Sequence, residues 1–259
     1  MSSTILECRT GSLPALYLGR AEVDDAGAPD FFAGLCADER TRLQAASSTL
    51  KLRAGQQVFS QGQFHTGIFI ILSGQVRSYY VGPSGREISL AYWSRGDIVG
   101  GPEVFGGGRH IWSARPTMPT KVMHVRGPEL RRLVTEIPKL AISVVEALEY
   151  QGKCYSAMIQ ILGTRSAAAR LAQLLLVMAD RDGHFAPEGL AIDRTLTHDD
   201  IGKMIGATRQ WVRTTLERLV ARRLIKICPT HIVITNRKEL YRFAGYSDEL
   251  LPARVVALR

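Results

Sequence analysis

Apolar residues recur along the chain with different spacings, and each spacing marks a different part of the molecule. Between residues 50 and 125, short runs rich in β-branched and aromatic residues are separated by glycine turns. The runs are 57–59, 68–72, 76–81, 88–92 and 122–125, and the turns contain Gly55, Gly62, Gly74, Gly85 and Gly96. Within the run 88–92 the side chains alternate as they do on a strand with two different faces. Many short strands at regular spacing predict a β-barrel or roll.

A single long helix is predicted over residues 139–162, between Pro138 and a further helix at 165–179. Its apolar positions recur at alternating steps of four and three residues, which is a heptad-like seam. The seam consists of Leu140, Val144, Ala147, Gln151, Cys154, Met158 and Ile161. We expect it to pair two copies of the chain; the alternative is a core helix packed on its own domain. Shorter helices are predicted at 37–46 and from Pro128, which is tolerated in a first helical turn.

Residues 196–216 predict two short amphipathic helices joined by a glycine turn. Thr197 suits the N-cap of the first helix, and Asp199 and Asp200 lie in its first turn, where the helix dipole favours negative charge. Gly206 can take the left-handed conformation that ends a helix, and Thr208 can cap the second. Two apolar runs, 224–227 and 232–234, flank a turn directly afterwards and predict a β-hairpin. The unit is therefore a predicted winged helix-turn-helix.

The second helix of this unit carries arginine on its polar faces, against one acid, Glu217. A helix that presents Arg, Gln and Thr outward suits the reading of base edges in a DNA major groove. The predicted DNA-binding residues are Thr197, Thr208, Arg209, Gln210, Arg213, Thr214 and Arg218. The alternative interpretation is a helical hairpin with a solvated basic face. The formal charge of +9 fits a polyanionic partner.

These elements give an α+β chain with five predicted parts. They are an irregular arm (1–30), a β-roll of jelly-roll type (31–127), a dimerisation helix region (128–163), the winged helix-turn-helix (164–239) and a tail (240–259). No apolar run approaches the ~18 residues of a membrane span, and no signal peptide is visible, so we expect a cytoplasmic protein. The four cysteines are too scattered for a disulfide framework or a zinc site. With no nucleophile elbow, P-loop or metal-binding triplet, we expect no enzyme activity.

The order of parts resembles the cyclic-AMP receptor protein and fumarate–nitrate regulator (Crp/Fnr) family of bacterial transcription factors. The resemblance covers roughly residues 31–236. In the roll it rests on Gln61-Gly62, Leu72-x-Gly74-x-Val76, Gly85-Arg86-Glu87 and Gly96-Asp97-Ile98-x-Gly100. In the winged helix-turn-helix it rests on Ile201-Gly202-x-x-Ile205-Gly206-x-x-Arg209-x-x-Val212. It implies double-stranded DNA with a two-fold symmetric operator, a second copy of the chain, and RNA polymerase as partners.

The family's cyclic-AMP chemistry does not transfer to this chain position by position. Cyclic-AMP binders place a Glu after the glycine at position 100, where this chain has Gly101. They place Arg-Ser for the phosphate where this chain has Ile111 and Trp112, or Trp112 and Ser113 with a one-residue insertion. A buried phosphate without its cation is expensive, so cyclic AMP is not expected as the effector.

The effector therefore stays open at this stage. Compared with cyclic-AMP binders, this chain has bulkier and less charged side chains at the pocket positions. The candidate pocket residues are Trp93, Gly100, Gly101, Phe105, Trp112, Ser113, Tyr155 and Ser156. Either the aromatic residues line a site for an apolar or aromatic effector, or they fill the pocket and no ligand is needed. An iron–sulfur cluster is not expected, because the cysteines near the N-terminus are not clustered. Haem is an alternative, since His65, His110 and His124 lie in or beside the roll and one histidine can hold a haem.

The sequence is also compatible with a different class of protein. The roll alone could belong to a regulatory subunit that gates a partner enzyme, as cyclic-nucleotide modules do elsewhere. The basic winged segment discriminates against that reading and favours a dimeric DNA-binding regulator.

Overall fold

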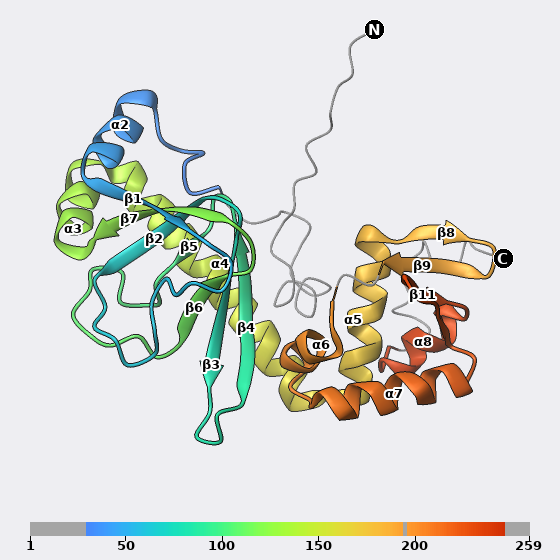
Figure 1. Cartoon of the computed structure of the whole chain (residues 1–259). Coiled ribbons are helices and arrows are strands. Elements are labelled where there is room, and N and C mark those ends of the chain that lie inside the picture. Colours follow the sequence, from blue (N-terminus) through green and yellow to red (C-terminus); the bar gives the residue numbers. More distant parts are fainter. Residues whose placement is uncertain (1–29, 194–195, 247–259) are drawn as a thin grey trace, which may run out of the picture. The chain divides into compact units, whose positions relative to one another are not determined.

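The computed structural model describes residues 30–193 and 196–246 (Figure 1). These residues form two compact units, and the boundary between the units falls between Cys154 and Tyr155, inside the long helix α4 (Pro138–Thr164). The predicted arm and the end of the predicted tail lie outside the described residues. Each unit is described below by itself.

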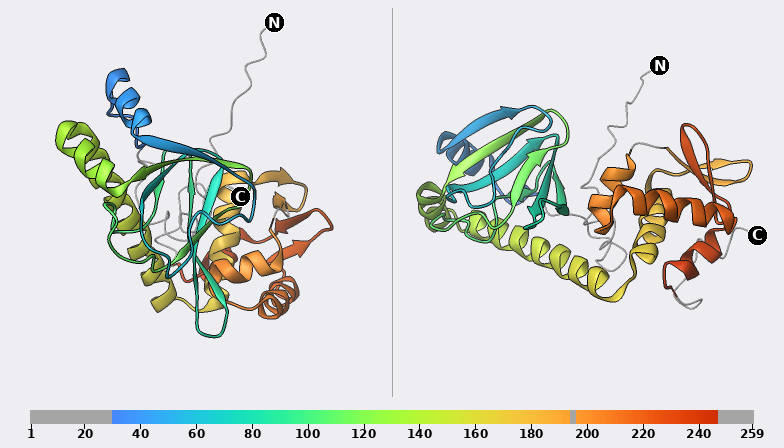
Figure 2. Two further views of the ribbon diagram at one scale, coloured as in Figure 1. Left: turned by 60° about the vertical axis from the view of Figure 1, so that its left-hand side comes forward. Right: turned by 60° about the horizontal axis from the view of Figure 1, so that its bottom comes forward.

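The first unit is built on two antiparallel sheets, as the strand pattern predicts (Figure 2). One sheet has the order β1-β7-β2-β5 and the other the order β4-β3-β6. The strands are β1 (Ser47–Leu52), β2 (Gly67–Ser73), β3 (Gln75–Val81), β4 (Glu87–Ser94), β5 (Ile98–Val99), β6 (Ser113–Pro116) and β7 (Thr120–Arg126). The run 57–59 is not a strand; it contributes only an isolated bridge between Phe59 and Ala114.

Glycine is required where the chain turns sharply between β2 and β3. Gly74 has φ +89°, and a Cβ there would lie 2.3 Å from the hydroxyl oxygen of Thr120. Both the positive φ and the close approach exclude a side chain at this position. The glycine spacing in the sequence therefore marks real turns of the roll.

Three helices of the described chain cover the first unit. They are α2 (Ala37–Ala45), α3 (Gly127–Glu136) and the first part of α4. Pro128 lies in the first turn of α3, and α4 begins at Pro138, as predicted. The helices share one apolar core with the β1-β7-β2-β5 sheet. Its members include Leu43, Ile68, Ile70, Met123, Val125, Leu130, Leu133, Leu140, Val144 and Ala147.

The residues of the predicted dimer seam of α4 are buried within the single chain. Val144 and Ala147 belong to the core of the first unit, and the side-chain amide of Gln151 donates to the carbonyl of Ile98 at 2.7 Å. Cys154, Met158 and Ile161 are also buried within a single chain. A heptad spacing shows that one helix face is covered, but not what covers it. Here the cover is the helix's own subunit.

A second apolar face of α4 is left exposed. Ile142, Val145, Ile159 and Leu162 are exposed to 56%, 63%, 71% and 37%. Val145 and Ile159 are two heptads apart in the sequence, so they lie on the same side of the helix.

Within its described residues, the second unit contains a four-stranded antiparallel sheet and four helices besides the end of α4. The sheet has the order β10-β11-β9-β8. Its strands are β8 (His184–Ala186), β9 (Gly189–Asp193), β10 (Ile225–Ile227) and β11 (His231–Ile234). The helices are α5 (Ala167–Asp182), α6 (His198–Ile205), α7 (Arg209–Ala221) and α8 (Arg237–Phe243). The predicted wing is β10 and β11, which pair from Ile225–Ile234 to Ile227–Ile232.

Helix α8 extends past residue 239, where the winged unit was predicted to end. Leu240 is fully buried, and the hydroxyl of Tyr241 donates to Asp180 of α5 at 2.9 Å. Asp180 also pairs with Arg237, so α8 is fixed to α5 by polar as well as apolar contacts.

Candidate nucleic-acid interface and effector pocket

The helix-turn-helix forms by the local signals that the sequence carries. The hydroxyl oxygen of Thr197 accepts from the backbone N–H of Asp200 at 3.1 Å, and that of Thr208 accepts from the N–H of Trp211 at 3.2 Å. Gly206 ends α6 with φ 68°, in the left-handed region. A Cβ on Gly202 would lie 2.7 Å from the carbonyl oxygen of Ala207, so the turn also needs glycine inside α6.

Helix α7 separates a buried apolar side from an exposed basic side. Val212, Leu216 and Leu219 are at most 1% exposed. Most of the predicted reading residues lie on the other side: Arg209, Gln210, Arg213 and Arg218 are exposed, whereas Thr214 and Trp211 are half-buried. Arg213 pairs with Glu217 one turn further along, at 3.0 Å. The structure therefore brings these predicted residues together on one helix surface, with the two cap threonines exposed at the starts of α6 and α7.

Sequence reasoning missed Arg170 of α5, which holds the helix-turn-helix in place. Its guanidinium donates to the carbonyl of Ile205 at the end of α6 (2.8 Å) and to that of Arg165 just after α4 (2.7 Å). A longer contact of 3.5 Å reaches the carbonyl of Leu162. The last carbonyls of a helix lack partners within the helix, and a buried cation satisfies them and complements the dipole. An arginine in an otherwise apolar stretch of α5 is the only signal that the sequence offers.

In the roll, the predicted effector pocket is filled by Trp93. Its ring is 1% exposed, and its indole N–H donates to the hydroxyl of Ser78 at 3.0 Å. The ring also meets Tyr150 of α4 edge to face, with 6.4 Å between centroids. The cavity left among Trp93, Tyr150 and Gln151 measures about 10 Å³. That is barely the volume that a single water molecule requires.

The other predicted pocket residues are only partly brought together. A Cβ on Gly101 would lie 3.4 Å from the ring of Trp112, and the hydroxyl of Ser113 accepts from the N–H of Gln61 at 2.9 Å. Gly100 is buried, while the ring of Phe105 lies under the guanidinium of Arg131. Tyr155 and Ser156 belong to the second unit; the residues of α4 that meet Trp93 and Ile98 are Tyr150 and Gln151, which the sequence did not single out for the pocket.

Neither nearby arginine is placed to bind a phosphate in this pocket. Arg109 donates to the carbonyl of Gly62 at 2.7 Å and lies over the ring of Phe64. Arg115 pairs with Glu87 at 2.7 Å and lies over the ring of Tyr79. Both guanidiniums are thus committed to other partners.

The three histidines of the roll are packing residues. His110 is stacked between Phe59, at 3.8 Å between ring centroids, and His65, at 4.2 Å. Burial lowers the pKa of all three histidines, for His110 to about 4. His65 bonds to the carbonyl of Gly100, and His124 stacks on Phe69. The rings of His65 and His110 are thus engaged in stacking contacts inside the roll.

One buried carboxyl borders the small cavity. Asp97 is 5% exposed, and burial raises the pKa of its carboxyl to about 7 although the N–H of Ser94 donates to it at 2.7 Å. In residues 30–193 and 196–246 the structure contains no group of three or more potential metal ligands. No helix in those ranges is long and apolar enough to cross a membrane.

The fold and the exposed basic helix define a class, DNA-binding transcription regulators with a sensing domain of the cyclic-nucleotide-binding type. Residues 49–136 match the cyclic nucleotide-binding domain, and residues 169–243 match the Crp-like helix-turn-helix domain. The two matches together cover more than half of the chain. The protein belongs to the Crp/Fnr family of transcription regulators, as its sequence motifs predict.

Relatives with assigned roles are regulators of this family and not enzymes. The fumarate and nitrate reduction regulatory protein of Vibrio cholerae is 28% identical over 200 residues, which cover 76% of this chain and 79% of that protein. The CRP-like cAMP-activated global transcriptional regulator of Mycobacterium tuberculosis is 25% identical over 190 residues, covering 73% and 85%.

Solved structures share the fold at lower identity. The c-di-GMP responsive global regulator CLP of Xanthomonas campestris superimposes with a TM-score of 0.68 at 17% identity, covering 77% of this chain and 99% of that one. A CooA variant from Carboxydothermus hydrogenoformans gives a TM-score of 0.64 at 20% identity, covering 78% and 89%. These likenesses establish the β-roll, long helix and winged helix-turn-helix.

Proposed function

We propose that the protein is a homodimeric, sequence-specific regulator that reads a two-fold symmetric operator with α7 of each subunit. The observation that carries this proposal is the exposed side of α7, where Arg209, Gln210 and Arg213 lie on the first turns and Arg218 lies further along, opposite a buried apolar side. Arginine pairs with guanine and glutamine with adenine in the major groove. That surface also favours a DNA-binding regulator over a regulatory subunit of an enzyme. RNA polymerase remains an expected further partner.

Selection of binding sites from random duplex DNA tests this proposal. We expect an inverted repeat whose half-sites lie about one helical turn apart, or a multiple of it, as two-fold dimers require. Family members that read the common half-site carry Glu and Arg where this chain has Gln210 and Thr214, so the selected half-site should differ from theirs. Recovery of the common cyclic-AMP receptor palindrome, or of no enriched site, would contradict the proposal.

We infer that dimerisation uses the exposed face of α4 rather than the seam that is buried in its own subunit. Ile142, Val145, Ile159 and Leu162 are large apolar side chains left open to solvent along one helix. Pairing two such helices removes this surface from water, which supplies the free energy of association.

The effector is inferred not to be cyclic AMP. Trp93 fills the interior of the roll, Arg109 and Arg115 are engaged elsewhere, and Ile111 at the phosphate position is 60% exposed. Of the two readings left by the sequence, the cavity of about 10 Å³ favours a filled pocket over one that receives an apolar ligand. Operator affinity should therefore be the same with and without cyclic AMP. Tighter operator binding with micromolar cyclic AMP would overturn this inference.

A further inference from the structure

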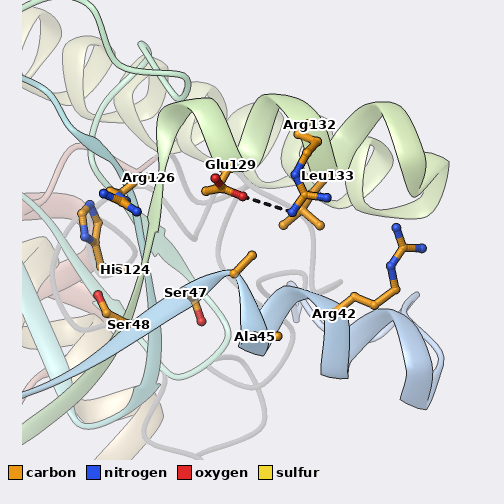
Figure 3. A pocket seen from close by; sticks show the side chains of 10 residues that line it. Arg42, Ala45, Ser47, Ser48, His124, Arg126, Glu129, Arg132 and Leu133 are labelled. Atoms are coloured by element: carbon orange, nitrogen blue, oxygen red, sulfur yellow. Dashed lines mark hydrogen bonds and ion pairs between the residues drawn. The ribbon is translucent and has the colours of Figure 1, made fainter.

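An open groove of the first unit lies outside the roll, between α2 and α3. The groove measures about 740 Å³, within the range of small-molecule sites, which is roughly 300–1,000 Å³. Figure 3 shows Arg42 of α2 facing Arg132 of α3, while His124 and Arg126 lie where β7 runs into α3. Of the residues that the sequence singled out, only His124, a candidate haem residue, lines this groove.

The groove is a basic surface in which two of the three arginines are held by ion pairs. Arg132 donates to Glu129 at 3.0 Å and to Glu136 at 2.9 Å, and Arg42 also pairs with Glu136. The pairs fix two guanidiniums on opposite walls, so little side-chain entropy is left to lose on binding. Three arginines against two carboxylates leave a net positive charge in the groove.

Arg126 supplies the uncommitted charge. Within the part of the chain that the structure describes, its guanidinium has no hydrogen bond or ion pair, and its side chain is exposed. Arg126 also helps burial to lower the pKa of the neighbouring His124, because a second positive charge beside it is unfavourable. The exposed Ser48 adds a hydroxyl to the same end of the groove. Arg126 therefore presents positive charge at this end of the groove, where the nearby carboxylate of Glu129 pairs with Arg132 and not with Arg126 (Figure 3).

We propose that this groove binds a small molecule that carries a phosphate group, with Arg126 as the anchor and with the paired Arg132 and Arg42 adding positive potential from the walls. Guanidinium groups bind phosphate through paired, charge-assisted hydrogen bonds. The site is separate from the interior of the roll and does not depend on the reading surface of α7.

The test uses pyrophosphate as the probe on the full-length chain, with the imidazole resonances followed by NMR at constant ionic strength. A phosphate beside Arg126 stabilises the imidazolium form, so pyrophosphate should raise the pKa of His124. His124 reports only on the groove, which separates this event from pyrophosphate bound to the basic side of α7. A pKa of His124 that does not move at saturating pyrophosphate would overturn the proposal.

Two exposed arginines supply a matched pair of variants. Arg126→Gln should weaken pyrophosphate binding at the groove at least about tenfold, the loss expected for charge-assisted hydrogen bonds. Arg131→Gln changes the next arginine along, on α3, where the guanidinium lies over the ring of Phe105, and should leave binding unchanged. Both variants should keep full operator affinity, so failure here is distinct from failure of the proposed function. Equal binding by wild type and Arg126→Gln, or binding of citrate as tight as that of pyrophosphate, would refute the assignment.

Discussion

At the scale of single residues, Arg209 is the sharpest test of the reading surface. It is the first residue of α7, exposed, and directly after the cap at Thr208. Arg209→Ala should remove preference at one base pair of each half-site, worth about 1–3 kcal/mol, and leave weak, salt-sensitive binding. Mobility shifts on operators substituted at each position measure the loss. Unchanged affinity for the specific site would show that Arg209 does not contact a base.

Two buried groups of the roll titrate with opposite effects on stability. The carboxyl of Asp97 has its pKa raised to about 7. Its contribution to the free energy of unfolding is therefore present at low pH and is lost as the pH rises through 7. The imidazole of His110 has its pKa lowered to about 4, so its contribution is present above its ordinary pKa and is lost as the pH falls toward 4. The two slopes oppose each other between about pH 4 and 7.

Asp97→Asn should therefore reveal the pH dependence that His110 gives to the stability of the roll. Asparagine keeps an oxygen for the N–H of Ser94 but does not titrate, so stability should rise more steeply between about pH 4 and 7 than in the wild type. Urea unfolding followed by tryptophan fluorescence at several pH values checks this. Parallel stability curves for the two proteins would mean that Asp97 does not carry the expected shift.

At the scale of elements, Arg170 connects the end of α4 to the helix-turn-helix through backbone carbonyls of both. We expect it to position α7. Arg170→Lys keeps the charge but cannot reach two carbonyls in a fork, so it should weaken specific operator binding more than nonspecific binding. Arg170→Met should lose both operator binding and stability, because the carbonyls remain buried without a donor. Thermal unfolding separates the two effects, and full operator specificity in Arg170→Lys would contradict a positioning role.

Elements with local signals were predictable, and those whose role depends on a distant neighbour were not. The caps at Thr197 and Thr208 and the glycine at 206 act within one turn of chain, so the sequence states them directly. The run 57–59 has the composition of a strand but forms only a bridge, because strand pairing is decided by distant residues. The spacing of the α4 seam is ambiguous for the same reason, since it does not distinguish contact with the roll from contact with a partner subunit.

At the scale of the whole molecule, two neighbouring positions of α4 separate dimerisation from folding. Ile159 is 71% exposed and Met158 is 4% exposed. Ile159→Glu should yield folded monomers, whereas Met158→Glu should destabilise the second unit by several kcal/mol through a buried unpaired charge. Light scattering gives the mass, and circular dichroism gives the stability. An intact dimer in Ile159→Glu would show that the exposed face is not the subunit contact.

The candidate sites were predictable to different depths for a physical reason. The DNA-binding surface lies on the single helix α7, so the helical spacing of its polar and apolar residues predicts which residues are exposed. The pocket is assembled from β3, β4 and α4, and only the structure shows that Trp93 reaches Ser78 and Tyr150 and closes it. The groove between α2 and α3 had no sequence signal, because Arg42 on one wall is far along the chain from Arg126 and Arg132 on the other.

The three tryptophans have an optical consequence. Trp93 is sealed inside the roll, Trp112 is half-buried beside Gly101, and Trp211 is half-buried on the reading helix. A buried indole fluoresces at a shorter wavelength and is protected from soluble quenchers. The fluorescence of a partly exposed indole changes when a ligand or DNA binds next to it. The fluorescence of three variants that each retain one tryptophan would therefore report on three separate places. Trp93 would report on the interior of the roll, Trp112 on the loop beside Gly101, and Trp211 on the contact of α7 with DNA.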